Sequence, residues 1–326
     1  MSTERVTLAD VAADAGVHAA TVSRALSRPD LVGDDTLERV NAAVARLGYV
    51  PNRAARQLAG GPTSMIAVLV PDLTNPFFAS YVQAAQRRAG DEGLLTVLGE
   101  TGLDPRRELE IVRSLASNVD GLLLAAPVTE GVALEAACGT TPRVLVNRRD
   151  AGRRWAVVDQ RQIVSLAVDH LRSLGHTRIG VVGGPQGYWS SAERLAATDD
   201  DSSLVTVDAV DPTFAGGRAA WDGVQTHELG AVVCFNDMIA LGLIAAATAD
   251  GVDVPAQLSV VGSDDIPLAT MVEPALTTVG APIDELADAS VALLVSLVDG
   301  TTSSDVVLEP YLVERGTTAP PPETSR

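Results

Sequence analysis

The sequence predicts an N-terminal all-α domain with a helix-turn-helix, followed by an α/β core of two parallel-sheet subdomains. Two observations support this prediction. The hydrophobic period is helical over the first sixty residues, and after Met65 it changes to short apolar runs that alternate with helix-length segments. That alternation is typical of βαβ units and parallel sheets. With 326 residues, 46% of them hydrophobic, the chain has room for two or three globular domains.

Residues 7–26, TLADVAADAGVHAATVSRAL, predict two short helices around a glycine turn. Gly16 permits the left-handed backbone of a tight connection, and Val17 can fill the angle between the helices. A third run, residues 34–47, has the same period and closes a small three-helix core. Apolar side chains at spacing i, i+3, i+4 form a stripe in each of the first two helices, namely Leu8, Val11 and Ala12, and then Val22, Ala25 and Leu26.

The second predicted helix leaves small and polar side chains for solvent. Small residues allow close approach to a DNA groove, hydroxyls can bond phosphate, and an arginine can form two hydrogen bonds with guanine. An alanine-rich helix pair with no DNA-binding role has the same pattern, so these residues alone leave both interpretations open. The predicted DNA-facing residues are His18, Ala19, Ala20, Thr21, Ser23 and Arg24.

The order of these segments, T-L-A-D-V-A, A-G-V, A-T-V-S-R-A-L and then G-Y-V-P-N-R-A-A-R-Q-L, resembles the LacI/GalR family of bacterial transcription regulators. The resemblance extends to about Arg315 and is most specific over the first sixty residues. It implies a helix-turn-helix domain over residues 1–50 and a periplasmic-binding-protein-like core. It also implies a homodimeric repressor that binds a pseudo-palindromic operator in double-stranded DNA and responds to a small-molecule effector, for which a carbohydrate is expected.

Residues 51–61 are predicted to form a hinge helix and linker. The segment from Asn52 to Ala59 favours a helix too short to be stable alone, and it ends at Gly60-Gly61-Pro62. The resemblance implies that the hinge helices of two subunits pair on operator DNA and that Leu58 enters the minor groove, where an apolar wedge kinks the duplex. A plain linker also fits the glycine-rich end. The DNA-binding prediction here covers Tyr49, Asn52, Arg53, Ala55 and Leu58.

The core is predicted over residues 62–315, with subdomain one formed by 62–157 and 282–315 and subdomain two by 158–281. Residues 316–326, rich in proline and threonine, are predicted to be a disordered tail. Helices are expected at residues 79–92 and 105–118. Continuous apolar runs of the kind that form strands buried on both faces occur at residues 66–70, 94–98, 121–125, 144–146, 179–182, 204–207, 231–235 and 258–261.

Polar and aromatic residues follow several of these strands, and the carboxyl ends of parallel strands are where open α/β sheets bind ligands. The resemblance implies that Arg194, Asn236 and Asp264 hydrogen-bond sugar hydroxyls, that Asn147 stands where an aspartate is common, and that Phe214 stacks on the ligand. For any one residue a helix cap or loop turn is an equal alternative, and Arg194 and Asp264 could instead pair as a structural salt bridge. The predicted effector site is Asn75, Phe77, Phe78, Asn147, Arg194, Phe214, Asn236 and Asp264.

The chain departs from the family pattern in four places. His18 replaces the Ser or Thr that usually starts the recognition helix, and Gly33 replaces a serine ahead of the third helix. Ala281 stands where many relatives carry a glutamine that enters the cleft. After Arg194 the next strand follows so soon that most of one helix is missing, and its replacement, Thr198 to Ser203, is predicted to be a loop. Such a deletion uncovers part of a sheet face or requires another element to cover it.

The net charge of −18 belongs to the core. Residues 1–60 carry seven arginines and seven acids, so the other residues hold 17 arginines and 35 acids. Cys138 and Cys234 are far apart, which predicts buried free thiols. No cofactor, metal or catalytic role is expected, because phosphate-loop, nucleophile-elbow and metal-ligand spacings are missing. The polar N-terminal helix and the lack of 18 consecutive apolar residues predict a cytoplasmic protein without membrane contact. A sugar-binding module, or a regulator that has lost its effector response, is the alternative.

Overall fold

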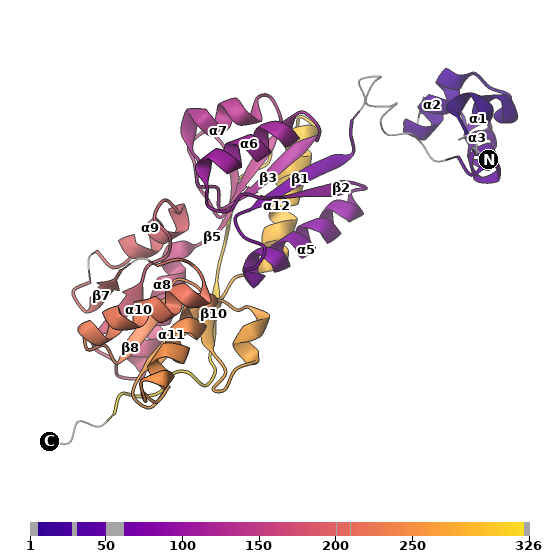
Figure 1. Ribbon diagram of the computed structural model, residues 1–326. Helices are drawn as coiled ribbons and strands as arrows, with labels where there is room; N and C mark the ends of the chain where they lie inside the picture. The colour runs from indigo at the N-terminus through magenta and orange to yellow at the C-terminus, as the bar shows by residue number, and fades with distance from the viewer. Residues whose placement is uncertain (1–5, 28–30, 50–61, 200, 209, 323–326) are drawn as a thin grey trace, which may run out of the picture. The chain divides into compact units, whose positions relative to one another are not determined.

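A computed structural model of the chain describes residues 6–27, 31–49, 62–199, 201–208 and 210–322 (Figure 1). The chain divides into two compact units, residues 1–63 and residues 64–326. The predicted fold class is confirmed, with helices in the first unit and two mainly parallel sheets in the second. The predicted hinge helix lies outside the described residues.

The first unit has the three predicted helices, α1 (Leu8–Ala15), α2 (Ala19–Ser27) and α3 (Asp34–Leu47). Thr7 and Asp10 form a reciprocal capping box at the start of α1, because the side chain of each accepts a hydrogen bond from the backbone N–H of the other. Gly16 ends α1 with φ 64° and ψ 38°, which confirms the left-handed turn predicted there.

The core of this unit consists of the predicted apolar stripes. Val11, Val22 and Val40, one from each helix, are fully buried and belong to one hydrophobic cluster. Gly33 is the N-cap of α3 and supplies no side-chain hydrogen bond, as expected from the missing serine. Asp34 and Asp35 in the first turn of α3 place negative charge where the helix dipole favours it.

The second unit contains two lobes, each built on a six-stranded sheet. We call the lobe with the strand order β11-β5-β4-β3-β1-β2 the first lobe. Its elements in chain order are β1 (Met65–Val70), α5 (Pro76–Asp91), β2 (Leu95–Glu100), α6 (Pro105–Ala116), β3 (Gly121–Ala125), α7 (Gly131–Cys138), β4 (Arg143–Val146), β5 (Arg154–Val158), α12 (Ile283–Val298) and β11 (Val306–Leu308).

The second lobe has the strand order β12-β10-β9-β8-β6-β7. Its elements are α8 (Gln160–Ser173), β6 (Ile179–Val182), α9 (Trp189–Ala196), β7 (Leu204–Val207), α10 (Phe214–Thr226), β8 (Ala231–Cys234), α11 (Asp237–Ala249), β9 (Ser259–Asp264), the short 3₁₀ helix η2 (Pro267–Thr270), β10 (Thr277–Gly280) and β12 (Tyr311–Val313). The loop prediction is confirmed for residues 198–199 and 201–203, which form turns and irregular backbone between α9 and β7.

Both sheets follow one topological rule. If the strands of each lobe are numbered in chain order, the first strand of the lobe lies between its second and third strands. The strand order of the sheet therefore reverses beside that first strand. All pairs are parallel except the antiparallel pair of β10 and β12. Ligands of doubly wound sheets bind at such a reversal, outside the carboxyl ends of the strands. The fold therefore indicates the loops that follow β1, β3, β6 and β8.

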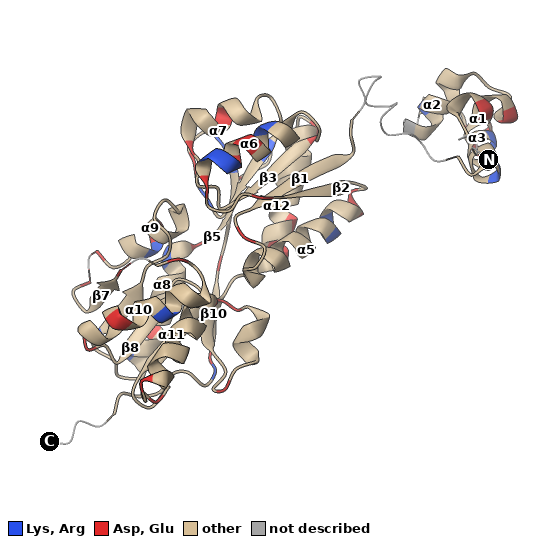
Figure 2. Cartoon of the chain, viewed as in Figure 1, with Lys and Arg blue, Asp and Glu red and all other residues tan. Residues whose placement is uncertain are grey.

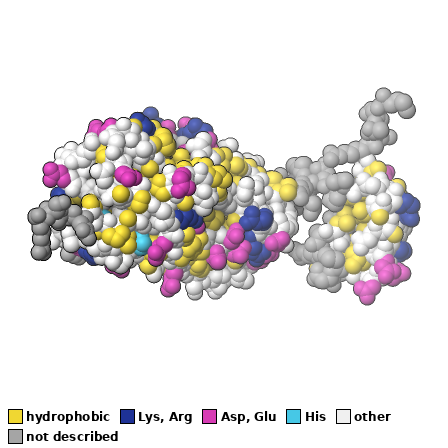
Figure 3. Space-filling view, turned by 90° about the horizontal axis from the view of Figure 1, so that it is seen from below, with side chains coloured by type: hydrophobic (Ala, Val, Ile, Leu, Met, Phe, Trp, Pro, Cys, Tyr) yellow, Lys and Arg dark blue, Asp and Glu magenta, His cyan; other side chains and the backbone are white. Residues whose placement is uncertain are grey.

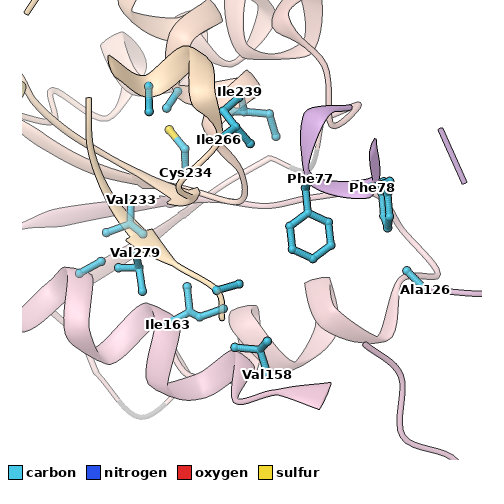
Figure 4. Close-up of a cluster of buried hydrophobic side chains, with 14 of the residues drawn as sticks. Phe77, Phe78, Ala126, Val158, Ile163, Val233, Cys234, Ile239, Ile266 and Val279 are labelled. Carbon is cyan, nitrogen blue, oxygen red and sulfur yellow. The ribbon is translucent and has the colours of Figure 1, made fainter. Parts of the chain in front are cut away.

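Helices cover both faces of the sheets. In the first lobe α5 and α12 pack together on one face, and α6 and α7 pack together with the other face. Figure 4 shows part of the buried apolar cluster, with Val233, Ile239 and Ile266 from the second lobe and Phe77 and Phe78 at the start of α5. On the face seen in Figure 3, acidic and basic side chains are scattered among exposed hydrophobic ones. Cys138 and Cys234 are buried free thiols, as predicted.

The structure corrects two domain assignments. Residues 311–313 were assigned to subdomain one, but they form β12, which pairs with β10 of the second lobe. Residues 316–322 were assigned to a disordered tail, but they pack on the second lobe. Thr317 is fully buried and donates a hydrogen bond to the carbonyl of Val260, and Ala319 N donates to Ser259 Oγ. Side-chain hydroxyls fix this proline-rich segment, a force that hydrophobic periodicity does not report.

Candidate functional site

The exposed face of α2 carries the residues that the sequence predicted. His18, Ala19, Ala20, Ser23 and Arg24 are exposed, and Thr21 is half-buried. The carbonyl of His18 accepts backbone hydrogen bonds from Thr21 and Val22, so His18 is the residue from which the helix starts. Arg24 is the single charged side chain of α2, in contrast to the charged α1 and α3 (Figure 2).

Arg24 differs from the other arginines of the first unit. Of the three that the structure describes there, Arg39 pairs with Asp35 and Arg46 pairs with Asp14, whereas Arg24 has neither an ion pair nor a hydrogen bond. An exposed guanidinium without a protein partner keeps all its donors for a ligand. Arg24 therefore offers the strongest available contact on this face.

Tyr49 does not share this exposed face. Only 8% of the residue is accessible, and it packs in the core of the three helices, because the left-handed turn at Gly48 returns the chain toward α3. The sequence-based assignment of Tyr49 to DNA contact overlooked this structural role. The other predicted contacts of this region, Asn52, Arg53, Ala55 and Leu58, lie outside the described residues and stay predictions.

The second unit contains a cavity of about 280 Å³ lined by residues of both lobes. Its walls come from the strand ends and loops that the topology indicated. Seven of the eight predicted effector residues line it, namely Asn75, Phe77, Phe78, Asn147, Arg194, Asn236 and Asp264. The rings of Phe77 and Phe78 form a T-shaped pair with centroids 5.2 Å apart (Figure 4). These aromatic rings supply the apolar wall of a site that is otherwise rich in polar groups.

Phe214 is the predicted residue that does not line the cavity. It is the first residue of α10 and is 42% exposed. Its neighbour Thr213, the N-cap of that helix, lines the cavity instead. In this conformation the aromatic contribution comes from Phe77, Phe78, Tyr188 and Phe235.

Arg194 is held in the wall of the cavity by the second lobe. Its Nε donates to Gln160 Oε1 at 2.8 Å, its Nη1 donates to the carbonyl of Phe235, and its guanidinium lies 4.6 Å from the centre of the Phe235 ring. Gln160 Nε2 in turn donates to Val158 O at the end of β5. Gln160 thus fixes the orientation of a buried arginine.

Asp264 lies at the end of β9 and faces the same cavity. Within the described part of the chain, its carboxylate forms no ion pair with Arg194 and accepts no hydrogen bond, which argues against a direct structural salt bridge. Burial raises the pKa of the Asp264 carboxyl well above its usual value, and the nearby Arg194 opposes this rise. Burial also lowers the pKa of Arg194, with the charges of Asp264 and Asp237 acting in the opposite direction. Arg194 is buried and Asp264 is half-buried, and both line the cavity, so both can contact polar ligand atoms.

The three asparagines of the cavity have structural roles as well. Asn75 Oδ1 caps α5 through Phe77 N, Asn236 Oδ1 caps α11 through Ile239 N, and Asn147 Oδ1 accepts from Val158 N. Asn236 Nδ2 donates to Pro212 O, whereas the Nδ2 groups of Asn75 and Asn147 have no partner among the residues described. The cap interpretation and the ligand interpretation are thus compatible for Asn75 and Asn147, which hold a loop with one atom and present the other.

Unusual backbone conformations concentrate around this cavity. Leu103, Ala126, Asn147 and Asp264 have φ values of 60°, 43°, 50° and 114°, and all four line it. Each such residue costs about 1–3 kcal/mol and persists only where the surrounding structure imposes it, which happens most often at functional sites.

Sequence reasoning missed ten of the seventeen lining residues. The missed residues are Asp72, Leu103, Ala126, Gln160, Tyr188, Ser190, Asp211, Pro212, Thr213 and Phe235. Gln160 was hidden because Arg154–Val158 was not predicted as a strand, so the polar residue after it was not considered a strand end. Tyr188 and Ser190 flank Trp189, where α9 begins. Their distance from the end of β6 concealed them.

The comparisons with known proteins agree with this architecture. Residues 7–52 match the family described as bacterial regulatory proteins, lacI family, and residues 168–318 match the periplasmic binding protein-like domain. The HTH-type transcriptional regulator reg1 of Streptomyces lividans is 36% identical, with 97% of each chain covered. The HTH-type transcriptional repressor CytR of Escherichia coli (strain K12) is 30% identical, with 96% of each covered.

The chain belongs to the LacI family of DNA-binding transcription regulators. The LacI-family fold extends over nearly all of it. The structure of the Lac repressor dimer bound to operator and the anti-inducer ONPF matches with a TM-score of 0.84 and 31% identity over 97% of this chain and 100% of that one. The transcriptional regulator CelR-cellobiose complex matches with a TM-score of 0.70 and 29% identity over 96% and 100%.

The described residues lack both a membrane-spanning helix and a cluster of metal-binding side chains. No helix there is long and apolar enough to span a membrane. Nor does that part of this LacI-family chain hold a group of three or more His, Cys, Asp and Glu side chains suited to a metal ion.

Proposed function

We propose that this regulator is a cytoplasmic repressor that binds a pseudo-palindromic operator as a homodimer and responds to a small carbohydrate in the cavity of its core. The DNA-binding part of the proposal rests on Arg24, an exposed guanidinium on a helix face of small residues, with no partner among the described residues. The match of residues 7–52 to the LacI family supports the same role for that face. The Lac repressor dimer bound to operator, a structural relative, supports binding as a dimer.

In this proposal Arg24 supplies the main base contact of α2. A bidentate arginine–guanine pair contributes about 1–3 kcal/mol of discrimination between bases. Ala19 and Ala20 add only methyl contacts, and the hydroxyls of Thr21 and Ser23 contact phosphate. Leu58 is proposed to enter the minor groove at the centre of the operator, as the family resemblance implies.

The DNA half is tested with the full chain, the fragment 64–326 and two arginine variants. The full chain should bind duplex in a salt-dependent way, and the fragment should not. Arg24→Ala should abolish the preference for operator over random duplex. Arg46→Ala is the matched control, because it removes the same charge from the same unit at a residue paired with Asp14. If footprints of Arg24→Ala and the unaltered protein gave the same operator preference, the assignment would be wrong.

The effector half rests on the composition of the cavity. A carboxylate, amides and an arginine beside aromatic rings are the groups that bind polyols, since they bond pairs of hydroxyls while rings pack on the apolar face of a sugar. The CelR-cellobiose complex, a relative in the same family, contains a carbohydrate.

We infer a mechanism of population shift between two arrangements of the lobes. Effector bound to both lobes favours one arrangement, and operator bound to the N-terminal units of the dimer favours the other. Reciprocity then requires operator to weaken effector binding by the same factor by which effector weakens operator binding.

The test of this half is Asp264→Asn, which removes the charge but keeps the size. The Asp264 carboxylate has no hydrogen bond in the part of the chain that the structure describes, so the variant should keep its melting temperature while losing calorimetric binding of an effector found by a thermal-shift screen. Arg194→Ala is less informative, because the loss of bonds to Gln160 and Phe235 also destabilises the second lobe. Protein that binds operator but responds to no sugar or nucleoside would favour a regulator that has lost its effector response.

A further inference from the structure

A second pocket adjoins the main cavity. It has a volume of about 430 Å³ and shares Leu103 and Asp211 with the main cavity. Like the main cavity, it is lined by both lobes, with Pro105 and Val128 from the first and Pro185 and Gln186 from the second. We call it the outer pocket. The two spaces are therefore chambers of one site, separated at Leu103 and Asp211.

The two chambers differ in chemistry. The main cavity holds the side chains able to read a dense set of hydroxyls, including Asn147, Arg194 and Asp264. The outer pocket has aliphatic and proline walls, and its polar side chains are Gln186 and Asp211, both exposed. The main cavity suits a sugar ring whose hydroxyls are hydrogen-bonded at every position. The outer pocket suits a sugar ring that packs its apolar face on the wall and keeps a few hydroxyls near solvent.

The boundary between the main cavity and the outer pocket is formed by residues with an unusual or fixed backbone conformation. Leu103 has a φ of 60°, a conformation that leucine rarely adopts because its Cβ crowds the following carbonyl. An outlier of this kind at a cavity wall supports a functional role. On the opposite side, the backbone of Asp211 is fixed by a 2.7 Å hydrogen bond from Thr213 N to Asp211 O, while its carboxylate has no partner among the described residues. A fixed backbone with an uncommitted carboxylate suits a hydroxyl near the junction of two rings.

Size supports the same conclusion. Binding sites for small ligands commonly have volumes of about 300–1,000 Å³. The main cavity alone, at about 280 Å³, falls at the lower limit, and the two chambers together fall well inside the range.

We propose that the effector is a disaccharide, with one sugar ring in the main cavity and the second in the outer pocket, linked past Leu103 and Asp211. The proposal rests on the carbohydrate response proposed above and narrows its ligand class. A nucleoside is the competing two-ring ligand. The outer pocket has no aromatic side chain to stack on a base, which favours a second sugar.

The experiment is calorimetry of the full chain with glucose, galactose, maltose, cellobiose, lactose and cytidine. At least one disaccharide should bind ten times more tightly than either hexose. Asp211→Ala should weaken that disaccharide about tenfold and Gln186→Ala severalfold, with hexose binding unchanged in Gln186→Ala, since Gln186 lines the outer pocket alone. Asp208→Ala is the matched control, because it removes an exposed carboxylate of the same loop that lines neither chamber.

The outcomes separate this inference from the proposed function. If a hexose binds as tightly as every disaccharide, or if disaccharide affinity is the same in all variants, the inference fails while the carbohydrate response stands. Tighter binding of cytidine than of any sugar would show that one of the two chambers holds a base and would overturn both the disaccharide and the carbohydrate class. No binding of any of the six compounds would overturn the carbohydrate response, and this inference with it.

Discussion

The two lobes of the core order their strands alike but differ in the helix that follows the first strand. In the first lobe β1 leads into α5, which has 16 residues, whereas in the second lobe β6 leads into α9, which has eight. In the first lobe α5 packs on α12, and in the second α9 packs on α8. The comparison shows that the strand order survives when one covering helix is half as long.

The two helix pairs, α5 with α12 and α8 with α9, are held together by different interactions. Tyr81 of α5 and Ser290 of α12 are fully buried, and their hydroxyls lie 2.8 Å apart. In the second lobe Arg161 of α8 and Glu193 of α9 form a partly exposed ion pair at 2.9 Å. The helices of the first lobe are stabilised by the buried contact between α5 and α12. The helices of the second lobe are stabilised by close packing at another place, between α10 and α11.

That close packing gives the largest predicted effect. A Cβ added at Gly217 of α10 would lie 2.0 Å from the backbone carbonyl oxygen of Ile239 in α11, so the helices must separate. Gly217→Ala should therefore lower the free energy of unfolding by about 3 kcal/mol. The measurement is urea unfolding followed by circular dichroism.

Gly90 of α5 is the matched control in the first lobe. A Cβ there meets nothing within 4 Å, so Gly90→Ala should be neutral or raise stability by about 0.5–1 kcal/mol. Equal unfolding midpoints for the two alanine variants would show that α10 and α11 are not the tightly packed pair of the second lobe.

The junction of α5 and α12 gives the next effect. Ser290→Ala leaves the buried Tyr81 hydroxyl without its partner and should cost about 2 kcal/mol, whereas Tyr81→Phe removes the hydroxyl itself and should cost about 1 kcal/mol. Glu193→Gln, which breaks the corresponding ion pair of the second lobe, should cost less than about 1 kcal/mol, because exposed pairs contribute little. The comparison of the lobes fails if Glu193→Gln proves the most damaging of the three in thermal unfolding.

The sequence predicts those features of the lobes that depend on apolar periodicity. The eight predicted strands all exist, because each is a continuous apolar run. The predicted burial on both faces is wrong for two of them, since the edge strands β2 and β7 are mostly half-buried or exposed. Four strands were missed. Arg154–Val158 begins with charged and half-buried residues, Thr277–Gly280 begins with two threonines, and Val306–Leu308 and Tyr311–Val313 are three-residue edge strands. Seven of the eight predicted effector residues line the cavity, and they were predicted because they follow strand ends. Gln160 was missed because the strand before it was not predicted. Leu103 was missed because its positive φ cannot be seen in a single sequence.

Each lobe also buries a carboxylate that holds a neighbouring loop, and burial raises the pKa of both. Glu108 accepts hydrogen bonds from Val128 N and Thr129 N, with Arg148 nearby, and burial raises the pKa of its carboxyl. Asp237 accepts from Ile266 N and Thr278 Oγ1. The pKa of its carboxyl is raised to about 7, mainly by burial, with these two hydrogen bonds and Arg315 opposing the rise and Asp265 adding to it.

The raised pKa of Asp237 determines how the free energy of unfolding changes with pH. The folded protein binds this proton more tightly than the unfolded chain, whose aspartate pKa is about 3.9, so the stabilisation is complete below that value and is lost as pH rises through about 7. Between pH 6 and pH 8 the unaltered protein should lose about 1 kcal/mol of unfolding free energy relative to Asp237→Asn. If urea unfolding gave parallel pH profiles for the two proteins, this prediction would be wrong. Glu108→Gln is the corresponding variant of the first lobe for the same measurement.

The smallest effect concerns the loop that replaces the missing half of α9. Asp201 accepts hydrogen bonds from the Ser203 side chain, from Arg172 at the end of α8 and from Ser203 N, and these lower the pKa of its carboxyl to about 2. Because the shift is downward, the contribution of Asp201 is present above about pH 3.9 and is lost as pH falls toward 2. A carbon-detected NMR titration should give that pKa in the unaltered protein and a higher one in Arg172→Ala. Ser202→Ala, an exposed neighbour with no side-chain bond among the described residues, should leave the pKa of Asp201 unchanged. If Asp201 titrates in the ordinary range in all three proteins, the loop is not fastened to α8, and the second lobe tolerates its short α9 without a compensating contact.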